Sequence, residues 1–144
     1  MLKGVDPLLS PDLLRVLRAM GHGDDLAIVD GNYPAEASGR PVLRFDGHSA
    51  TTMLNAILSV LPLDTFVPKA AWCMAVVGEP DAEQPIFDEF RASIRTHEGA
   101  QFGLAKLERF AFYDQARKAF AVVATGERRL YGNIILRKGV IRQA

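Results

Sequence analysis

"SPDLLRVLRAMGHGDDLAIVD", residues 10–30, combines a helix that has clear start and stop signals with an apolar strand that follows it directly. Ser10 is a typical N-cap, Pro11 suits the first helical position, and Gly21 lies just past the last turn. Apolar residues recur at helical spacing within the stretch, at Leu13, Leu14, Leu17 and Met20. The run at 25–30 has four consecutive apolar residues between two aspartates, which predicts a buried strand.

The rest of the chain repeats this alternation of helices and apolar strands. Further strands are predicted at 41–47, 70–78, 104–110, 119–127 and 132–139. Helices are predicted at 51–60, 85–96 and 112–119, with one helical turn at 34–38. Strands that are apolar along most of their length are typical of a sheet covered on both faces, which favours an α/β fold. The last two strands follow each other closely, so part of the sheet is expected to be antiparallel.

Length and composition predict one globular domain over residues 1–144. Hydrophobic residues make up 49% of the 144 residues, charged residues 24%, and no linker or internal repeat is present. The 17 basic and 17 acidic residues cancel, which argues against a nucleic-acid partner and removes a barrier to self-association. No apolar run approaches the ~18 residues of a membrane span, and no signal peptide is evident. The expected location is the cytoplasm, with no membrane partner.

Sequence motifs for cofactors, metals and covalent catalysis are absent. No glycine-rich nucleotide-binding motif follows a strand, and no G-x-S-x-G nucleophile motif occurs. His22, His48 and His97 have no neighbours at zinc-ligand spacing, and Cys73 lies in an apolar run typical of a core residue. We therefore expect no metal and no cofactor.

One histidine stands out because two glycines flank it. Gly21 and Gly23 on either side of His22 destabilise regular structure, since glycine loses the most backbone entropy on folding. The simple interpretation is a connector in which one glycine closes the helix and the other opens the strand. The alternative is a tight turn that points the imidazole into a pocket.

Four other polar residues lie where apolar strands begin or end. Asp30 ends the strand at 25–30, Arg109 stands among apolar residues, and Tyr131 and Asn133 precede the last strand. Ligands of open α/β sheets bind beyond the carboxyl ends of strands. Each residue also has an ordinary structural explanation: a turn aspartate, an arginine along the sheet edge, or turn residues. With His22 they form a set suited to a polyhydroxyl ligand, with one group able to move protons near pH 7.

Several longer blocks of sequence carry a family resemblance. They are "MLKGVDPLLSPDLLRVLRAMGHGD" (1–24), Asp30 with "YPAE" (33–36), "RFDG" (44–47), "RFAFYDQARKAFAVVATGER" (109–128) and "YGNIILRKGV" (131–140). Through these blocks the chain resembles the RbsD/FucU family of sugar mutarotases, and is most similar to the L-fucose mutarotase branch. The resemblance covers nearly the whole chain.

The resemblance implies a fold, a set of site residues and an assembly. The family fold is a three-layer α/β/α sandwich with a mixed, mostly parallel sheet of about six strands. His22 matches the catalytic histidine, and the sugar-binding positions are matched by Asp30, Arg109, Tyr131 and Asn133. Family members form ring-like homo-oligomers, often decamers, and use no cofactor. Arginine at position 109 is typical of the fucose branch, whereas Asn32 stands where that branch is expected to carry histidine.

The implied activity is that of an isomerase which interconverts the α and β anomers of L-fucose or a related monosaccharide through the open-chain aldehyde. Ring opening needs a proton taken from the anomeric hydroxyl and a proton delivered to the ring oxygen, a task suited to histidine. Asp30 either orients His22 or accepts a sugar hydroxyl, and the sequence leaves both roles open. Two alternatives also remain: a non-catalytic monosaccharide-binding or transport-accessory protein, and a ribose pyranase-type isomerase.

Overall fold

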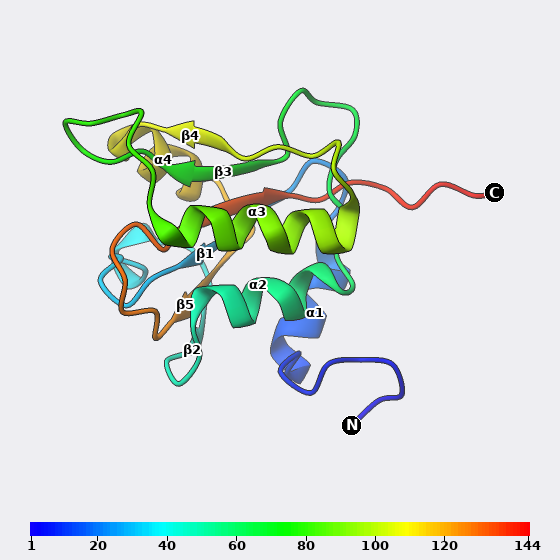
Figure 1. Ribbon diagram of the computed structural model, residues 1–144. Helices are drawn as coiled ribbons and strands as arrows, with labels where there is room; N and C mark the ends of the chain where they lie inside the picture. The colour runs from blue at the N-terminus through cyan, green and yellow to red at the C-terminus, as the bar shows by residue number, and fades with distance from the viewer.

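A six-stranded sheet forms the centre of the computed structural model, which describes all 144 residues (Figure 1). The strands lie in the order β2-β5-β1-β6-β3-β4. Their bounds are β1 Asp25–Val29, β2 Val42–Phe45, β3 Ala71–Met74, β4 Ala105–Leu107, β5 Ala121–Thr125 and β6 Ile134–Arg137. The pairs β1–β5, β2–β5 and β3–β4 are parallel, and β6 is antiparallel to both β1 and β3. The prediction of an α/β fold with a mixed, mostly parallel sheet is confirmed.

The last two strands do not pair with each other. β6 is the antiparallel strand, but its neighbours are β1 and β3, while β5 lies on the other side of β1. Leu26 of β1 therefore has Ala121 as its partner on one side and Leu136 on the other. The short connection between β5 and β6 crosses the end of β1, which brings residues 126–133 next to Asp30.

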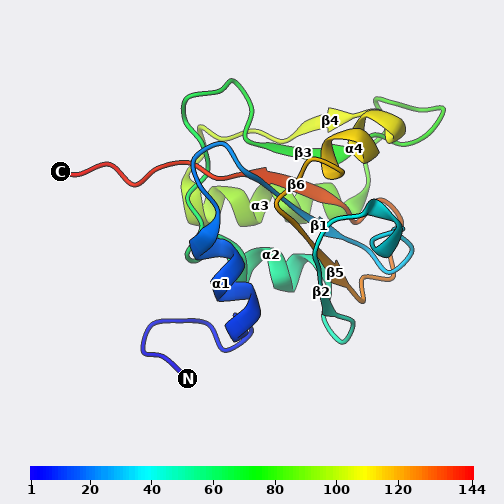
Figure 2. The same cartoon turned by 180° about the vertical axis from the view of Figure 1, so that it is seen from behind.

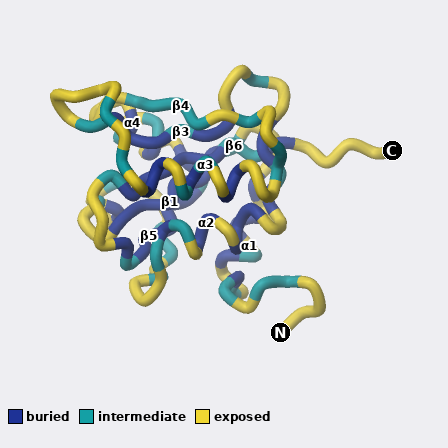
Figure 3. Tube along the Cα trace, in the orientation of Figure 1, coloured by how far each residue is buried: buried dark blue, intermediate teal, exposed yellow.

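Helices cover both faces of the sheet, as Figures 1 and 2 show from opposite sides. One face carries α1 Pro11–Ala19, α2 Ala50–Leu58 and α3 Pro85–Glu98, and the other carries α4 Arg109–Ala116 and the 3₁₀ turn η1 Glu36–Ser38. Side chains of β1 alternate between the two cores, with Leu26 and Ile28 on the first face and Ala27 and Val29 on the second. Every residue of β1 and β5 is buried (Figure 3). None of the four helices is both long enough and apolar enough to cross a membrane.

The first helix forms as its end signals predict. The Ser10 hydroxyl accepts a hydrogen bond from the Leu13 amide at 3.2 Å, and Pro11 occupies the first helical position. At the other end, the Lys138 ammonium donates to the carbonyl oxygens of Leu17 and Met20, at 2.7 and 2.6 Å. These contacts satisfy carbonyl groups that the helix leaves unpaired and tie the helix to the end of β6.

The predicted strand at 104–110 was too long. β4 ends at Leu107, and Arg109 is the first residue of α4 rather than a residue of the sheet edge. The physical reason is the N-cap: the Glu108 carboxylate accepts hydrogen bonds from the amides of Phe110 and Ala111, at 3.0 and 3.1 Å. This cap competes successfully with strand pairing because it satisfies amides at the helix start.

Candidate active site

A pocket of about 210 Å³ opens where the carboxyl ends of the parallel strands meet the amino end of β6. Because β6 runs antiparallel to β1 and β3, its first residues lie beside the last residues of those strands. The pocket is lined by Asp30, Asn32, Tyr33, Met74, Val77, Arg109, Tyr113, Leu130, Tyr131 and Asn133. We call it the carboxyl-edge pocket. It brings together four of the five site residues predicted from the sequence.

One larger hollow on the surface is mostly apolar. An apolar pocket of about 360 Å³ lies between α1 and the C-terminal segment, with Leu14, Leu17 and Ile141 among its walls. Ligand sites combine an apolar lining with a few convergent polar groups. The carboxyl-edge pocket has this combination, because a carboxylate, an amide and a phenol face an apolar wall formed by Met74 and Leu130.

Asp30 is buried at the base of the carboxyl-edge pocket. One carboxylate oxygen accepts a hydrogen bond from the Asn32 amide at 3.0 Å, and the other accepts from the Gly132 amide at 3.2 Å. Burial raises the pKa of Asp30, and these backbone hydrogen bonds offset only part of that effect, so the pKa lies above its ordinary value. The Asp30 amide donates to Asn133 Oδ1 at 2.8 Å. Because that oxygen is engaged, the side-chain NH₂ of Asn133 is left to donate to a ligand.

Tyr131 adopts a backbone conformation that side chains rarely occupy. Its φ is 61°, and it is the one residue other than glycine with a positive φ. The Tyr131 hydroxyl accepts a hydrogen bond from the Val77 amide at 3.1 Å, which leaves the hydroxyl proton available to a ligand in the pocket. Strain of this kind persists only where the surroundings hold it, and it is concentrated at functional sites.

Arg109 reaches the pocket from the first turn of α4. Its Nε donates to the Tyr113 hydroxyl at 3.2 Å, and the guanidinium lies 5.4 Å from the Phe110 ring centroid. Tyr113 also packs edge-on against Tyr33, with ring centroids 5.4 Å apart. Burial raises the pKa of Tyr33 to about 12, so its hydroxyl stays protonated at neutral pH. Neither tyrosine was predicted from the sequence, although the four-residue spacing of Arg109 and Tyr113 puts those two side chains on one helix face.

His22 lies at the opposite edge of the sheet, before the first residue of β1. The five residues of β1 separate it from Asp30, a span of ~17 Å at the usual rise of a strand. Its Nε2 is 3.0 Å from Asp64 Oδ1, and its ring centroid is 5.1 Å from that of Phe66. The His22 side chain is 44% exposed, whereas that of Asp64 is 2% exposed. Within one chain, the structure does not bring His22 into the carboxyl-edge pocket.

Asp64 is a third residue that was not predicted from the sequence. Burial raises the pKa of this carboxylate, but hydrogen bonds from the Phe66 amide and the His22 ring outweigh it, and the pKa lies below its ordinary value. A carboxylate at this distance orients the imidazole. His22 and Asp64 are 42 positions apart, and no local pattern connects them. No group of three or more His, Cys, Asp or Glu side chains is placed to hold a metal ion.

Comparisons with known proteins match the chain over nearly its full length. Residues 3–141 match the model of the RbsD / FucU transport protein family. The human fucose mutarotase is 48% identical over 146 residues, which cover 97% of this chain and 94% of that protein. The crystal structure of FucU from Bifidobacterium longum is 46% identical with a TM-score of 0.91, and covers 97% of this chain and 100% of that one.

A solved complex supports the same relationship. The fucose mutarotase from Streptococcus pneumoniae, in complex with L-fucose, is 40% identical with a TM-score of 0.91, and the match covers 98% of this chain and 100% of that chain. Both the sequence match and the structural match extend through the six strands and four helices described above. The chain therefore belongs to the RbsD/FucU family.

Proposed function

We propose that this protein is an L-fucose mutarotase, an isomerase that interconverts the α and β anomers of the sugar by acid–base ring opening. The observation that carries the proposal is the carboxyl-edge pocket, in a chain 40% identical to a fucose mutarotase solved with L-fucose. A carboxylate, an amide, a phenol and a guanidinium converge there, and all of them suit sugar hydroxyls. The apolar wall of Met74, Val77 and Leu130 suits the methyl group that L-fucose carries at C6.

The reaction needs one group that exchanges protons at neutral pH. The C1–O5 bond breaks when a proton leaves the anomeric hydroxyl and another reaches the ring oxygen, and it re-forms on either face of the aldehyde. Arg109 and Asn133 are not suited to this, because arginine stays protonated and asparagine does not titrate. The Tyr131 hydroxyl is held as an acceptor by the Val77 amide, which suits it to binding a sugar hydroxyl. We assign the proton transfers to His22, which Asp64 orients at 3.0 Å.

His22 reaches a sugar in this pocket only if a second copy of the chain supplies it. Exposed apolar side chains lie beside both halves of the proposed site: Phe66 next to His22, at 59% exposed, and Leu130 on the pocket rim, at 64% exposed. Exposed apolar side chains that lie together mark interaction surfaces, and Leu130 shares the pocket rim with the exposed Val77. A formal charge of zero adds no repulsion between copies. We therefore propose a homo-oligomer, with the ring of ten subunits expected from the family. A solution mass of 15.8 kDa by light scattering would contradict it.

Anomer exchange measured by saturation-transfer NMR tests the proposed activity. The exchange between α- and β-L-fucose should accelerate in proportion to protein concentration, and more strongly than the exchange of D-ribose. A non-catalytic sugar-binding protein would bind L-fucose without changing the exchange rate. A ribose pyranase-type isomerase would accelerate ribose exchange more than fucose exchange.

The affinity for L-fucose is expected to fall as the pH is lowered, and to start falling at a higher pH than an ordinary aspartate would give. The cause is Asp30, whose raised pKa means that it takes up a proton above the ordinary range and loses an acceptor for a sugar hydroxyl. Calorimetric titration of L-fucose from pH 7 down to about pH 4 measures the effect, within the range where carboxylates titrate. The Asp30→Asn variant is the control and should show no such dependence; an equal fall in both proteins would rule out Asp30 as the cause.

Arg109→Met is expected to weaken L-fucose binding modestly, by at most about tenfold. The guanidinium is exposed and therefore already hydrated, so a lost hydrogen bond to the sugar is largely replaced by water. Methionine keeps the contact with the Phe110 and Tyr113 rings through its apolar chain. Calorimetry measures the affinity, and Arg95→Met, at an exposed arginine in the last turn of α3, is the matched control. A loss well above tenfold would show that Arg109 is desolvated in the complex.

A further inference from the structure

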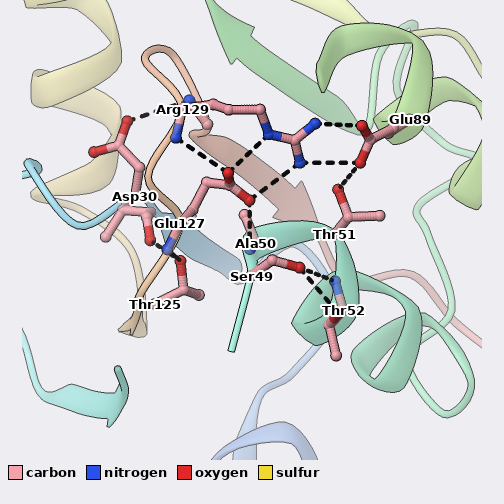
Figure 4. A network of polar contacts seen from close by, with 11 residues as sticks. Asp30, Ser49, Ala50, Thr51, Thr52, Glu89, Thr125, Glu127 and Arg129 are labelled. Atoms are coloured by element: carbon pink, nitrogen blue, oxygen red, sulfur yellow. Dashed lines mark hydrogen bonds and ion pairs between the residues drawn. The ribbon is translucent and has the colours of Figure 1, made fainter. Parts of the chain in front are cut away.

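A buried carboxylate lies behind the carboxyl-edge pocket without lining it. Glu127 follows β5, is 4% exposed, and accepts four hydrogen bonds (Figure 4). Oε1 accepts from the Arg129 amide at 3.1 Å and from Arg129 Nε at 2.8 Å. Oε2 accepts from the Ala50 amide and from Arg129 Nη2, both at 3.2 Å. Arg129 holds the pKa of Glu127 below its ordinary value, so the carboxylate is ionised at neutral pH.

These hydrogen bonds join the loop after β5 to two helices. Ala50 is the first residue of α2, so Glu127 places a negative charge where the helix dipole favours it. Arg129 continues to Glu89 on α3, with Nη2 3.0 Å from Oε1. Glu89 Oε1 also accepts from the Thr51 hydroxyl on α2 at 2.8 Å. Figure 4 shows these side chains in one connected group, which fixes the loop against both helices.

The backbone of Glu127 is tied to the segment that carries Asp30. Its carbonyl oxygen accepts a hydrogen bond from the Gly31 amide at 2.9 Å. Its amide donates to the Thr125 hydroxyl at 3.2 Å, and that hydroxyl donates to the Val29 carbonyl at 2.7 Å. The position of Glu127 therefore sets the position of the chain on both sides of Asp30.

The side chain of Glu127 supports the strained turn at 131–133 directly. A Cβ at Gly132 would lie 2.7 Å from Glu127 Cγ and 3.3 Å from Asp30 Cβ, so the turn packs tightly on both residues. This turn holds Tyr131 at a φ of 61° and carries Asn133, and the surrounding contacts must keep it in that conformation. Among these contacts, Glu127 is the ionised group that links the turn to α2 and, through Arg129, to α3.

We propose that Glu127 is a positioning residue, which holds Tyr131 and Asn133 in the geometry that a ligand of the carboxyl-edge pocket requires. The proposal rests on the proposed function insofar as that ligand is L-fucose. Glu127 itself is absent from the pocket lining, so it acts through the turn and not by contact with the sugar. Its replacement should alter the affinity without altering the proton transfers.

The test is Glu127→Gln, which keeps the shape of the side chain and removes its charge. We expect the KM for L-fucose to rise about 10- to 100-fold, the range for misplacement of binding groups, with kcat and the pH–rate profile unchanged. The matched control is Glu83→Gln, which weakens two ion pairs away from the pocket, to Arg91 on α3 (Nη1–Oε1 2.6 Å) and to Lys106 on β4 (Nζ–Oε2 2.5 Å). It should leave the KM within about twofold of the unaltered protein, as expected for an exposed pair.

A second readout needs no sugar and separates this proposal from the proposed function. The Gly31 amide donates to the Glu127 carbonyl oxygen, and the Gly132 amide donates to the Asp30 carboxylate. Hydrogen exchange of both amides should accelerate in Glu127→Gln and not in Glu83→Gln. If Glu127→Gln does not fold, Arg129→Met tests the same connection and should give the same two changes. A lower melting temperature with unchanged KM and unchanged amide exchange would overturn the proposal. If the unaltered protein does not act on L-fucose but the amide hydrogen exchange changes as expected, only the proposed function is overturned.

Discussion

Replacing His22 with alanine is expected to slow the protein-dependent exchange of L-fucose anomers by ~10²- to 10⁴-fold, the usual contribution of a general acid–base group. The side chain is 44% exposed and makes one hydrogen bond, to Asp64, which keeps its hydrogen bond from the Phe66 amide. The variant should therefore fold, and its affinity for L-fucose should change little. Saturation-transfer NMR gives the exchange rate, and calorimetry gives the affinity.

The matched control for this experiment is His97→Ala, at an exposed histidine in the last turn of α3. It should retain full activity, since no part of the proposed site includes this residue. A folded His22→Ala variant that exchanges the anomers at the unaltered rate would remove His22 from the mechanism. Asp30 would then be the titratable carboxylate left in the pocket to carry the proton transfers.

Asn133→Ala is expected to weaken L-fucose binding by about 1–3 kcal/mol, roughly 5- to 150-fold, because the substitution removes two hydrogen bonds at once. The first is the bond from its NH₂ group to the sugar. The second is the bond that Asn133 Oδ1 accepts from the Asp30 amide at 2.8 Å, which leaves a buried amide unpaired next to the ligand. Asn133 is 4% exposed, so water does not readily replace either bond. The effect should exceed that of Arg109→Met.

The pH dependence of the rate distinguishes binding from proton transfer at this position. Asn133→Ala should leave the pH–rate profile unchanged, because asparagine does not titrate. The control is Asn55→Ala, at an exposed asparagine of α2, which should change neither the affinity nor the profile. A strong shift of the profile with unchanged affinity would place Asn133 in the proton-transfer machinery.

Local sequence signals predicted most of the fold. The cap at Ser10, the apolar stripe of α1 and the apolar run of β1 are all decided by neighbours within a few residues. The end of β4 was misplaced because the Glu108 side chain begins a helix where apolar residues suggested a longer strand. The partners of β6 could not be predicted, since strand order depends on contacts between residues more than a hundred positions apart, such as Asp25 and Arg137.

The candidate site could also be predicted only in part from the sequence, because some of its contacts join residues far apart in the chain. The polar residues of the site could be singled out from their places beside apolar strands or between glycines, and the family resemblance gave each an expected role. His22 precedes the predicted strand at 25–30 and Asp30 ends it, so the predicted strand itself separates the two residues. The contact with Asp64 depends on a close approach at Gly139, where a Cβ would lie 2.4 Å from the Leu63 carbonyl oxygen. Such an approach is visible only in three dimensions.

Mixing two impaired variants tests most directly whether His22 of one copy serves the pocket of another. His22→Ala and Asn133→Ala chains are refolded together in equal amounts, and L-fucose exchange is measured at a concentration far below the KM of Asn133→Ala. In a mixed oligomer, some sites combine an intact His22 from one chain with an intact pocket from the other. Random assembly predicts about one quarter of the unaltered activity, because half of the chains supply an intact His22 and half supply an intact pocket. Activity no higher than the mean of the two variants measured separately would contradict a shared site.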